Sequence, residues 1–102
     1  MADEPEDHTL LIGLKIGDPE GYRRYREAMT PILERHGGRF GYDFVVAEVL
    51  RSEVDAPIDR VFTMVFPSRE VRSAFFADPS YRRVRETWFE PSVLHVTQLA
   101  EF

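Results

Sequence analysis

Four residues of this sequence have side chains that could bind or convert a small molecule: Tyr22, Arg60, Trp88 and His95. Arg60 can hold a carboxylate or an enolate through two parallel hydrogen bonds, although an ion pair with the adjacent Asp59 is the interpretation we favour. His95 can act as a base if it faces a cavity, but a histidine satisfied in the core or in an interface is preferred. We predict that these four residues form the candidate pocket.

Other common chemistries find no support in the residue pattern. The three histidines, His8, His36 and His95, do not have the spacing of metal ligands. His36 is expected instead to interact with the negative end of the helix before it. The chain has no cysteine, which excludes disulfides, thiol catalysis and cysteine-ligated metals. Gly37-Gly38 lacks the patterns of phosphate-binding loops. We therefore predict no metal and no cofactor.

A group of aromatic residues could line an apolar pocket between helices and a sheet. Such residues at helical spacing are first of all core residues, and a pocket for a flat ligand is the less favoured interpretation. The group consists of Tyr22, Tyr25, Phe75, Phe76, Tyr81, Trp88 and Phe89.

In the first half of the chain, the spacing of apolar residues is first that of a strand and then that of a helix. Residues 8–16 predict a strand, because every second residue is apolar on one face. Asp18 is expected to cap the following helix with its side chain, and Pro19 suits its first position. Gly37-Gly38 predicts a left-handed stop.

The second half predicts three strands and a broken helix. The long strand 39–51 should place Phe40, Tyr42 and Phe44 on one face, and residues 52–59 should connect it to a strand over 60–66. Ser68 is expected to cap a helix that breaks at Asp78-Pro79. Glu90-Pro91 is expected to end the next helical run, before a last strand over 93–99.

This order predicts an α+β protein with the ferredoxin-like arrangement β-α-β-β-α-β. Right-handed crossovers convert it into a four-stranded antiparallel sheet with both helical layers on one face. The opposite face should meet water, yet several strands are apolar on both sides, unlike a half-solvated sheet. No part of the chain is left over to cover that face. We therefore predict a homodimer joined through the sheets.

Charge and length limit the kinds of partner. The formal net charge is -5, and four of the 18 acidic residues lie within the first seven positions. We expect residues 1–7 to form a disordered acidic tail and residues 8–102 to form a single domain. The nearly neutral body argues against nucleic acid, and no apolar run is long enough for a membrane helix. An acidic start also disfavours a targeting peptide, so the cytoplasm is the expected location.

Four short motifs in order make the chain resemble the domain of unknown function 1330 family, within the dimeric α+β barrel superfamily. The resemblance covers residues 10–99 and implies a ferredoxin-like fold and a sheet-to-sheet dimer, but no settled activity. One departure is the continuous strand through Tyr42-Asp43-Phe44, where many relatives have a polar turn with glycine. The motifs are Asp18-Pro19-Glu20-Gly21-Tyr22 with Tyr25-Arg26, Gly37-Gly38-Arg39-Phe40, Asp59-Arg60-Val61 leading to Phe66-Pro67-Ser68, and Asp78-Pro79-Ser80-Tyr81.

Two functions from different classes follow. The first is a homodimeric protein without demonstrated catalysis that binds a small apolar or aromatic molecule between helices and sheet. The alternative is a cofactor-independent monooxygenase or isomerase, because such activities occur elsewhere in the resembled superfamily; fold analogy alone is a weak basis for function.

Overall fold

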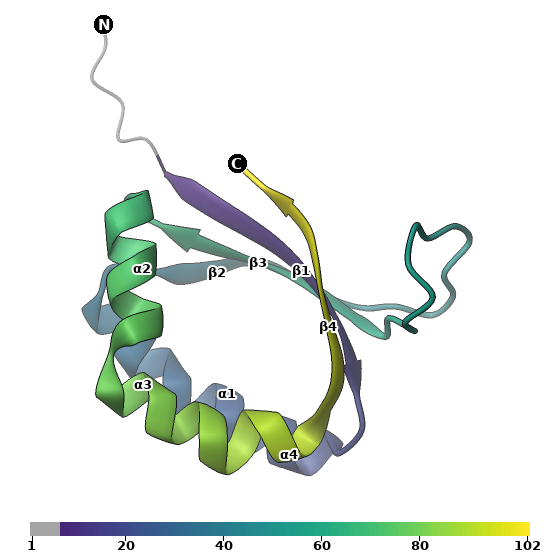
Figure 1. Cartoon of the computed structure of the whole chain (residues 1–102), viewed down its shortest axis with the longest axis horizontal. Helices are drawn as coiled ribbons and strands as arrows, with labels where there is room; N and C mark the ends of the chain where they lie inside the picture. Colours follow the sequence, from purple (N-terminus) through teal and green to yellow (C-terminus); the bar gives the residue numbers. More distant parts are fainter. Residues whose placement is uncertain (1–6) are drawn as a thin grey trace, which may run out of the picture.

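The helices of the structure lie together on one side of a curved antiparallel sheet (Figure 1). The computed structural model describes residues 7–102, and the strand order is β2-β3-β1-β4. The predicted ferredoxin-like fold is confirmed. The elements are β1 (His8–Ile16), α1 (Pro19–Arg35), β2 (Arg39–Val45), β3 (Arg60–Phe66), α2 (Arg69–Ala77), α3 (Pro79–Val84), the π-helix η1 (Arg85–Phe89), α4 (Glu90–Ser92) and β4 (Val93–Glu101).

The predicted acidic tail over residues 1–7 lies outside the described residues, except for Asp7, which is exposed.

Most of the predicted helix boundaries form as the local chemistry requires. The Ser68 hydroxyl accepts a hydrogen bond from the Val71 amide at 3.1 Å, and the Asp78 carboxylate accepts one from the Ser80 amide at 2.8 Å. The break at Asp78-Pro79 is therefore confirmed. Gly37 has φ of +79°, the left-handed conformation expected after α1.

Two expected helix boundaries are wrong in their details. The Asp18 side chain makes no capping hydrogen bond; its backbone amide instead donates to the Ser92 carbonyl at 3.0 Å. Glu90-Pro91 does not end the last helical run, because α4 continues to Ser92. The helical run ends one residue after Pro91, where the Ser92 hydroxyl donates to the Trp88 carbonyl at 2.6 Å.

Strand β2 is shorter than predicted, and it ends at Val45 instead of residue 51. Its neighbour β3 begins at Arg60, directly opposite Val45. Residues beyond Val46 therefore have no partner strand, and their alternating apolar pattern alone cannot maintain a strand. Residues 46–59 instead form a loop that projects to the right in Figure 1.

A β-bulge changes which side chains of β2 face the helices. The pairing with β3 shifts between Phe40 and Asp43, and the Tyr42 amide donates to the Thr63 hydroxyl at 2.8 Å. Because two residues of β2, Gly41 and Tyr42, lie opposite the single Thr63, Phe40 and Asp43 both lie opposite buried residues, Met64 and Phe62. The prediction that Phe40, Tyr42 and Phe44 share one face is wrong.

The core lies between the sheet and the helices. It combines alternate residues of β1 and β3 with the inward stripe of α1, as the periodicity predicts. The buried hydrophobic residues are Leu10, Ile12, Leu14, Tyr22, Tyr25, Met29, Ile32, Leu33, Phe62, Met64, Phe66, Phe75 and Tyr81.

The outer face of the sheet is apolar, as predicted, but part of it is covered by the chain itself. Tyr42 and Phe44 stack on each other and are 66% and 56% exposed. Ile58, from the 46–59 loop, packs over Gly13, where an added Cβ would lie 3.1 Å from the Ile58 side chain. The expectation that no part of the chain remains to cover this face is wrong, because residues 46–59 form a loop instead of extending the sheet.

Candidate ligand-binding site

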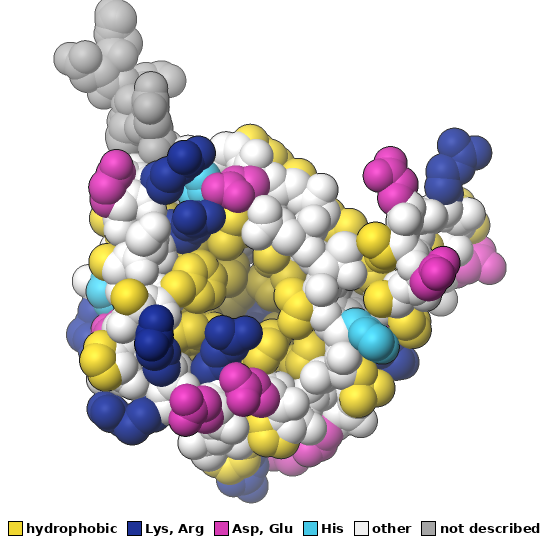
Figure 2. Space-filling view, viewed as in Figure 1, with side chains coloured by type: hydrophobic (Ala, Val, Ile, Leu, Met, Phe, Trp, Pro, Cys, Tyr) yellow, Lys and Arg dark blue, Asp and Glu magenta, His cyan; other side chains and the backbone are white. Residues whose placement is uncertain are grey.

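A cavity of about 310 Å³ lies between the sheet and the helices. Figure 2 shows it as a hollow at the centre of this face, with hydrophobic side chains inside and charged side chains around it. Its lining residues come from β1, β3, β4 and every helical segment except α4. They are Leu10, Ile12, Leu14, Tyr25, Phe62, Met64, Arg72, Phe76, Tyr81, Arg85, Phe89, Val96 and Gln98.

The sheet provides the apolar floor of this cavity. Leu10, Ile12 and Leu14 point toward the helices because alternate residues of a strand share one face, and β3 adds Phe62 and Met64 beside them. All five side chains are buried in the core. A floor of this kind favours apolar or aromatic surface over a polar solute.

Two tyrosines form the most buried polar group of the lining. The hydroxyls of Tyr25 and Tyr81 lie 2.8 Å apart, and the two residues are only 5% and 4% exposed. Burial raises the pKa of both phenols, that of Tyr25 strongly, so both are protonated near neutral pH. They can donate hydrogen bonds but cannot act as bases there.

The charged groups at the edge of the cavity differ in how they are paired. Arg72 donates to the Glu101 carboxylate at 2.9 Å, and Gln98 donates to the same carboxylate at 3.1 Å. Arg85 is exposed, and its guanidinium carbon lies 5.8 Å from the centre of the Phe89 ring. Within residues 7–102, Arg85 has no ion pair. Arg85 and Phe89 are the first and last residues of η1, a helix type often found at functional sites.

The structure brings two of the four predicted pocket residues together. The guanidinium carbon of Arg60 lies 5.5 Å from the centre of the Tyr22 ring. Arg60 donates two hydrogen bonds to Asp43, at 2.7 and 2.9 Å. The favoured pairing of Arg60 with Asp59 is therefore wrong. Asp59 instead accepts a hydrogen bond from Lys15 at 3.1 Å. The β-bulge brings Asp43 to the face of the sheet where it meets Arg60.

A second arginine joins the same cluster on the helix side of the sheet. Arg26 donates to the Tyr22 hydroxyl at 2.7 Å, and its guanidinium lies 3.2 Å from the Asp43 carboxylate. The hydrogen bond from Arg60 lowers the pKa of Asp43, and burial raises that of Tyr22. These groups pair with one another and join α1 to β2 and β3, although the Nη2 atom of Arg26 is buried without a hydrogen-bond partner among residues 7–102.

We expect Asp43→Asn to lower the free energy of unfolding by about 1–3 kcal/mol. Removing one partner of a buried ion pair costs about 3–5 kcal/mol, but Asp43 is 31% exposed, so solvent screens part of this loss. The pKa of Asp43 is lower in the folded protein than in the unfolded chain. Its contribution to the free energy of unfolding is therefore complete above the unfolded pKa of about 3.9, and it is lost as the pH falls through the folded pKa.

Urea titrations at fixed protein concentration, between pH 7 and pH 3, measure this effect. The difference between wild type and Asp43→Asn should shrink toward the acid end. The control is Glu27→Gln, because Glu27 pairs with Arg23 on the exposed face of α1 and its replacement should change stability by less than about 0.5 kcal/mol. A constant difference at every pH would contradict this assignment.

The other two predicted residues lie elsewhere. Trp88 is half-buried, with the guanidinium carbon of Arg24 5.3 Å from its ring centre. His95 lies opposite Lys15 on the outer face of the sheet and is exposed. The interpretation of His95 as a satisfied core histidine is therefore wrong. None of the four predicted residues lines the helix–sheet cavity, and their role in ligand binding stays a prediction.

His36 has a different partner from the expected one. Its Nε2 atom lies 2.9 Å from the Asp78 carboxylate, which contributes to lowering the pKa of Asp78. The interaction therefore links the end of α1 to the break between α2 and α3, two segments 42 residues apart.

The four predicted site residues include none of the polar residues that line the cavity, which are Tyr25, Arg72, Tyr81, Arg85 and Gln98. Both tyrosines were assigned to the aromatic core group, and they are indeed buried there. A partial sequence signal was available, because Tyr25 and Tyr81 are two of the phenols in that group and buried phenols require partners. Arg85 carried no such signal, because its place at the cavity depends on the π-helical turn.

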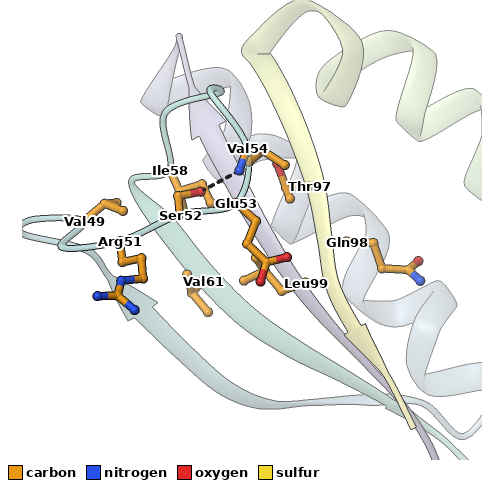
Figure 3. Close-up of a pocket in the computed structure, with 10 residues that line it drawn as sticks. All are labelled: Val49, Arg51, Ser52, Glu53, Val54, Ile58, Val61, Thr97, Gln98 and Leu99. Carbon is orange, nitrogen blue, oxygen red and sulfur yellow. Dashed lines mark hydrogen bonds between the residues drawn. The ribbon is translucent and has the colours of Figure 1, made fainter.

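A second pocket, of about 510 Å³, lies on the outer face of the sheet under the 46–59 loop (Figure 3). The loop itself is held locally by the Val54 amide, which donates to the Ser52 hydroxyl at 3.2 Å. The pocket is lined by Val49, Arg51, Ser52, Glu53, Val54, Ile58, Val61, Thr97, Gln98 and Leu99.

No helix within residues 7–102 combines the length and the apolar character that a membrane crossing requires. The same residues contain no cluster of three side chains suited to hold a metal ion.

Comparison with known families places the chain in one of them. The model of the family described as a domain of unknown function (DUF1330) matches residues 10–97, and the chain belongs to this family. None of the curated proteins matches the chain.

Several solved structures have the same fold. A protein of unknown function from Rhodopseudomonas palustris is 21% identical, with a TM-score of 0.81 over 98% of this chain and 83% of that one. A DABB family protein with a ferredoxin-like fold from Mesorhizobium loti is 12% identical, with a TM-score of 0.66 over 94% of both chains. SnoaB, a cofactor-independent oxygenase from Streptomyces nogalater, is 12% identical, with a TM-score of 0.60 over 94% of this chain and 95% of SnoaB. At these identities the similarity shows the fold alone.

Proposed function

We propose that this protein is a homodimer that binds a small apolar or aromatic molecule in the cavity between its helices and its sheet. The observation that carries the proposal is the cavity itself, with an apolar floor and the buried Tyr25–Tyr81 pair. Ligand sites commonly combine mostly apolar walls with a few placed polar groups. A volume of about 310 Å³ is about twice that of an engineered cavity of about 150 Å³ that holds benzene, so a molecule of one or two rings fits.

Catalysis by the same cavity is the second candidate. A cofactor-independent oxygenase, which is how SnoaB is described, or an isomerase generally needs a group that removes a proton from its substrate. The described lining residues offer phenols, guanidinium groups and an amide, but no carboxylate, imidazole or thiol. The lining therefore supports binding better than proton abstraction. Turnover of a bound compound would favour the second candidate.

Filling the cavity should abolish ligand binding without unfolding the protein. Val96 lines the cavity from the edge strand β4 and is 53% exposed, so Val96→Trp can place an indole across the cavity at a low cost in strain. A thermal-shift screen with aromatic acids, quinones and lactones should raise the melting temperature of the wild type. At 100 times the Kd, a ligand stabilises the folded state by about 2.7 kcal/mol.

The control for this experiment is Leu94→Trp. Leu94 is on the same strand and is 62% exposed, but it does not line the cavity. The shift should persist in Leu94→Trp and disappear in Val96→Trp. An equal shift in both variants would show that the compound binds outside the cavity.

The dimer is supported by the outer face of the sheet. Tyr42, Phe44 and Leu99 expose large apolar side chains there, and the outer pocket continues this surface under the 46–59 loop. Large exposed apolar side chains on both edge strands, β2 and β4, favour an interaction through this face. A second copy presenting the same face would remove both surfaces from water, since a two-fold interface pairs each patch with itself.

A further inference from the structure

The polar groups of the helix–sheet cavity are not all satisfied within the protein. The Tyr25 and Tyr81 hydroxyls share one hydrogen bond, which uses only one of their two protons. The second proton has no acceptor among residues 7–102. A buried hydroxyl without an acceptor is costly, so this proton is available to an acceptor atom inside the cavity.

A positive charge lies close to this pair. Arg85 follows Tyr81 by four residues on the same helical run and also lines the cavity. Its charge acts on the Tyr81 hydroxyl and partly opposes the rise in pKa that burial causes. Arg72, by contrast, already donates to Glu101, so Arg85 is the lining guanidinium that has no carboxylate partner within residues 7–102.

An aromatic surface completes this end of the cavity. The Phe89 ring centre lies 4.9 Å from that of Tyr25. The guanidinium carbon of Arg85 lies 5.8 Å from the same Phe89 ring centre. A hydrogen-bond donor, a cation and an aromatic ring therefore line the same cavity. A negatively charged oxygen on a planar ring system satisfies all three at once.

We propose that the cavity selects acidic aromatic ligands, whose anionic oxygen accepts the free proton of the Tyr25–Tyr81 pair and faces Arg85. This inference rests on the proposed function, because it assigns a chemical class to the ligand of the same cavity. The rings occupy the apolar floor formed by β1 and β3. Neutral aromatic molecules of the same shape fit the floor but leave Arg85 without a counterion.

Two matched compounds test the inference, 2-naphthoate and its neutral analogue 2-naphthamide. Calorimetric titration of the wild type should show that the carboxylate binds about tenfold to a hundredfold more tightly than the amide, since a hydrogen bond to a charged group contributes more than a neutral one. Arg85→Gln should reduce this ratio to near one. Arg85 is exposed, so the variant should fold like the wild type.

Two further variants separate the roles of the neighbouring groups. Tyr81→Phe keeps the ring but removes the hydroxyl, and it should weaken the binding of both compounds. Arg83→Gln is the matched control, because Arg83 is exposed in the same helical run but does not line the cavity. It should leave the ratio unchanged.

The outcomes separate this inference from the proposed function. Equal affinity of the wild type for the two compounds, with binding abolished by Val96→Trp, overturns the preference for an acid and leaves the proposed cavity ligand standing. An unchanged ratio in Arg85→Gln also overturns the inference. Failure of the wild type to bind either compound or any member of the aromatic screen overturns both.

Discussion

Replacing Phe44 with glutamate should convert the proposed dimer into a folded monomer, raising its Kd by at least about a hundredfold. Phe44 is 56% exposed in a single chain, on the outer face of the sheet, so the charge costs the monomer little. In a sheet-to-sheet dimer the substitution occurs once on each copy, and burying an ionised carboxylate costs several kcal/mol. About 1.4 kcal/mol corresponds to a tenfold change in Kd.

Light scattering and sedimentation at micromolar concentration measure this change, and far-ultraviolet circular dichroism shows that the variant is folded. The control is Ala74→Glu, which places the same charge on an exposed position of α2, away from the sheet. It should remain dimeric. A wild type that is monomeric at these concentrations would refute the proposed dimer, and a dimeric Phe44→Glu variant would place the interface elsewhere.

Replacing Phe75 with alanine should lower the free energy of unfolding by about 3–5 kcal/mol. Phe75 is 0% exposed, and its ring packs against Phe66 at 5.7 Å and against Tyr81 at 4.4 Å between ring centres. Removing a buried phenyl ring forfeits its burial and leaves a cavity. In a domain of this size each kcal/mol lowers the melting temperature by about 4–8 °C.

Urea denaturation at constant protein concentration provides the measurement, because a dimer's stability depends on concentration. Phe102→Ala is the control, since Phe102 is 68% exposed and its loss should cost little. Because Phe75 supports the Tyr81 ring, the folded fraction of Phe75→Ala should also bind aromatic ligands more weakly. A loss below about 1 kcal/mol would contradict the packing described for Phe75.

The two faces of the sheet have different roles in these proposals. The face toward the helices carries the cavity and its polar groups, whereas the outer face carries the apolar surface for a second copy. Gln98 lies at the edge between them, because it lines both pockets. Substitutions on one face should therefore affect ligand binding, and those on the other should affect assembly.

The sequence by itself determined the element order, the face of β1 that enters the core and most helix starts. These features follow from local causes. Strand alternation, helical spacing and caps such as Ser68 and Asp78 act over a few residues. The apolar outer face was also predictable, because several strands carry apolar residues on both sides, and the family resemblance agreed with the same topology.

Only the tertiary structure decided where β2 ends, which side Asp43 faces and which groups meet in the cavity. The end of β2 depends on where its partner β3 begins, and the bulge that joins Asp43 to Arg60 depends on cross-strand pairing. Tyr25 and Tyr81 are 56 residues apart in the chain. Their contact requires the helices to pack on the sheet, and no local pattern encodes that meeting.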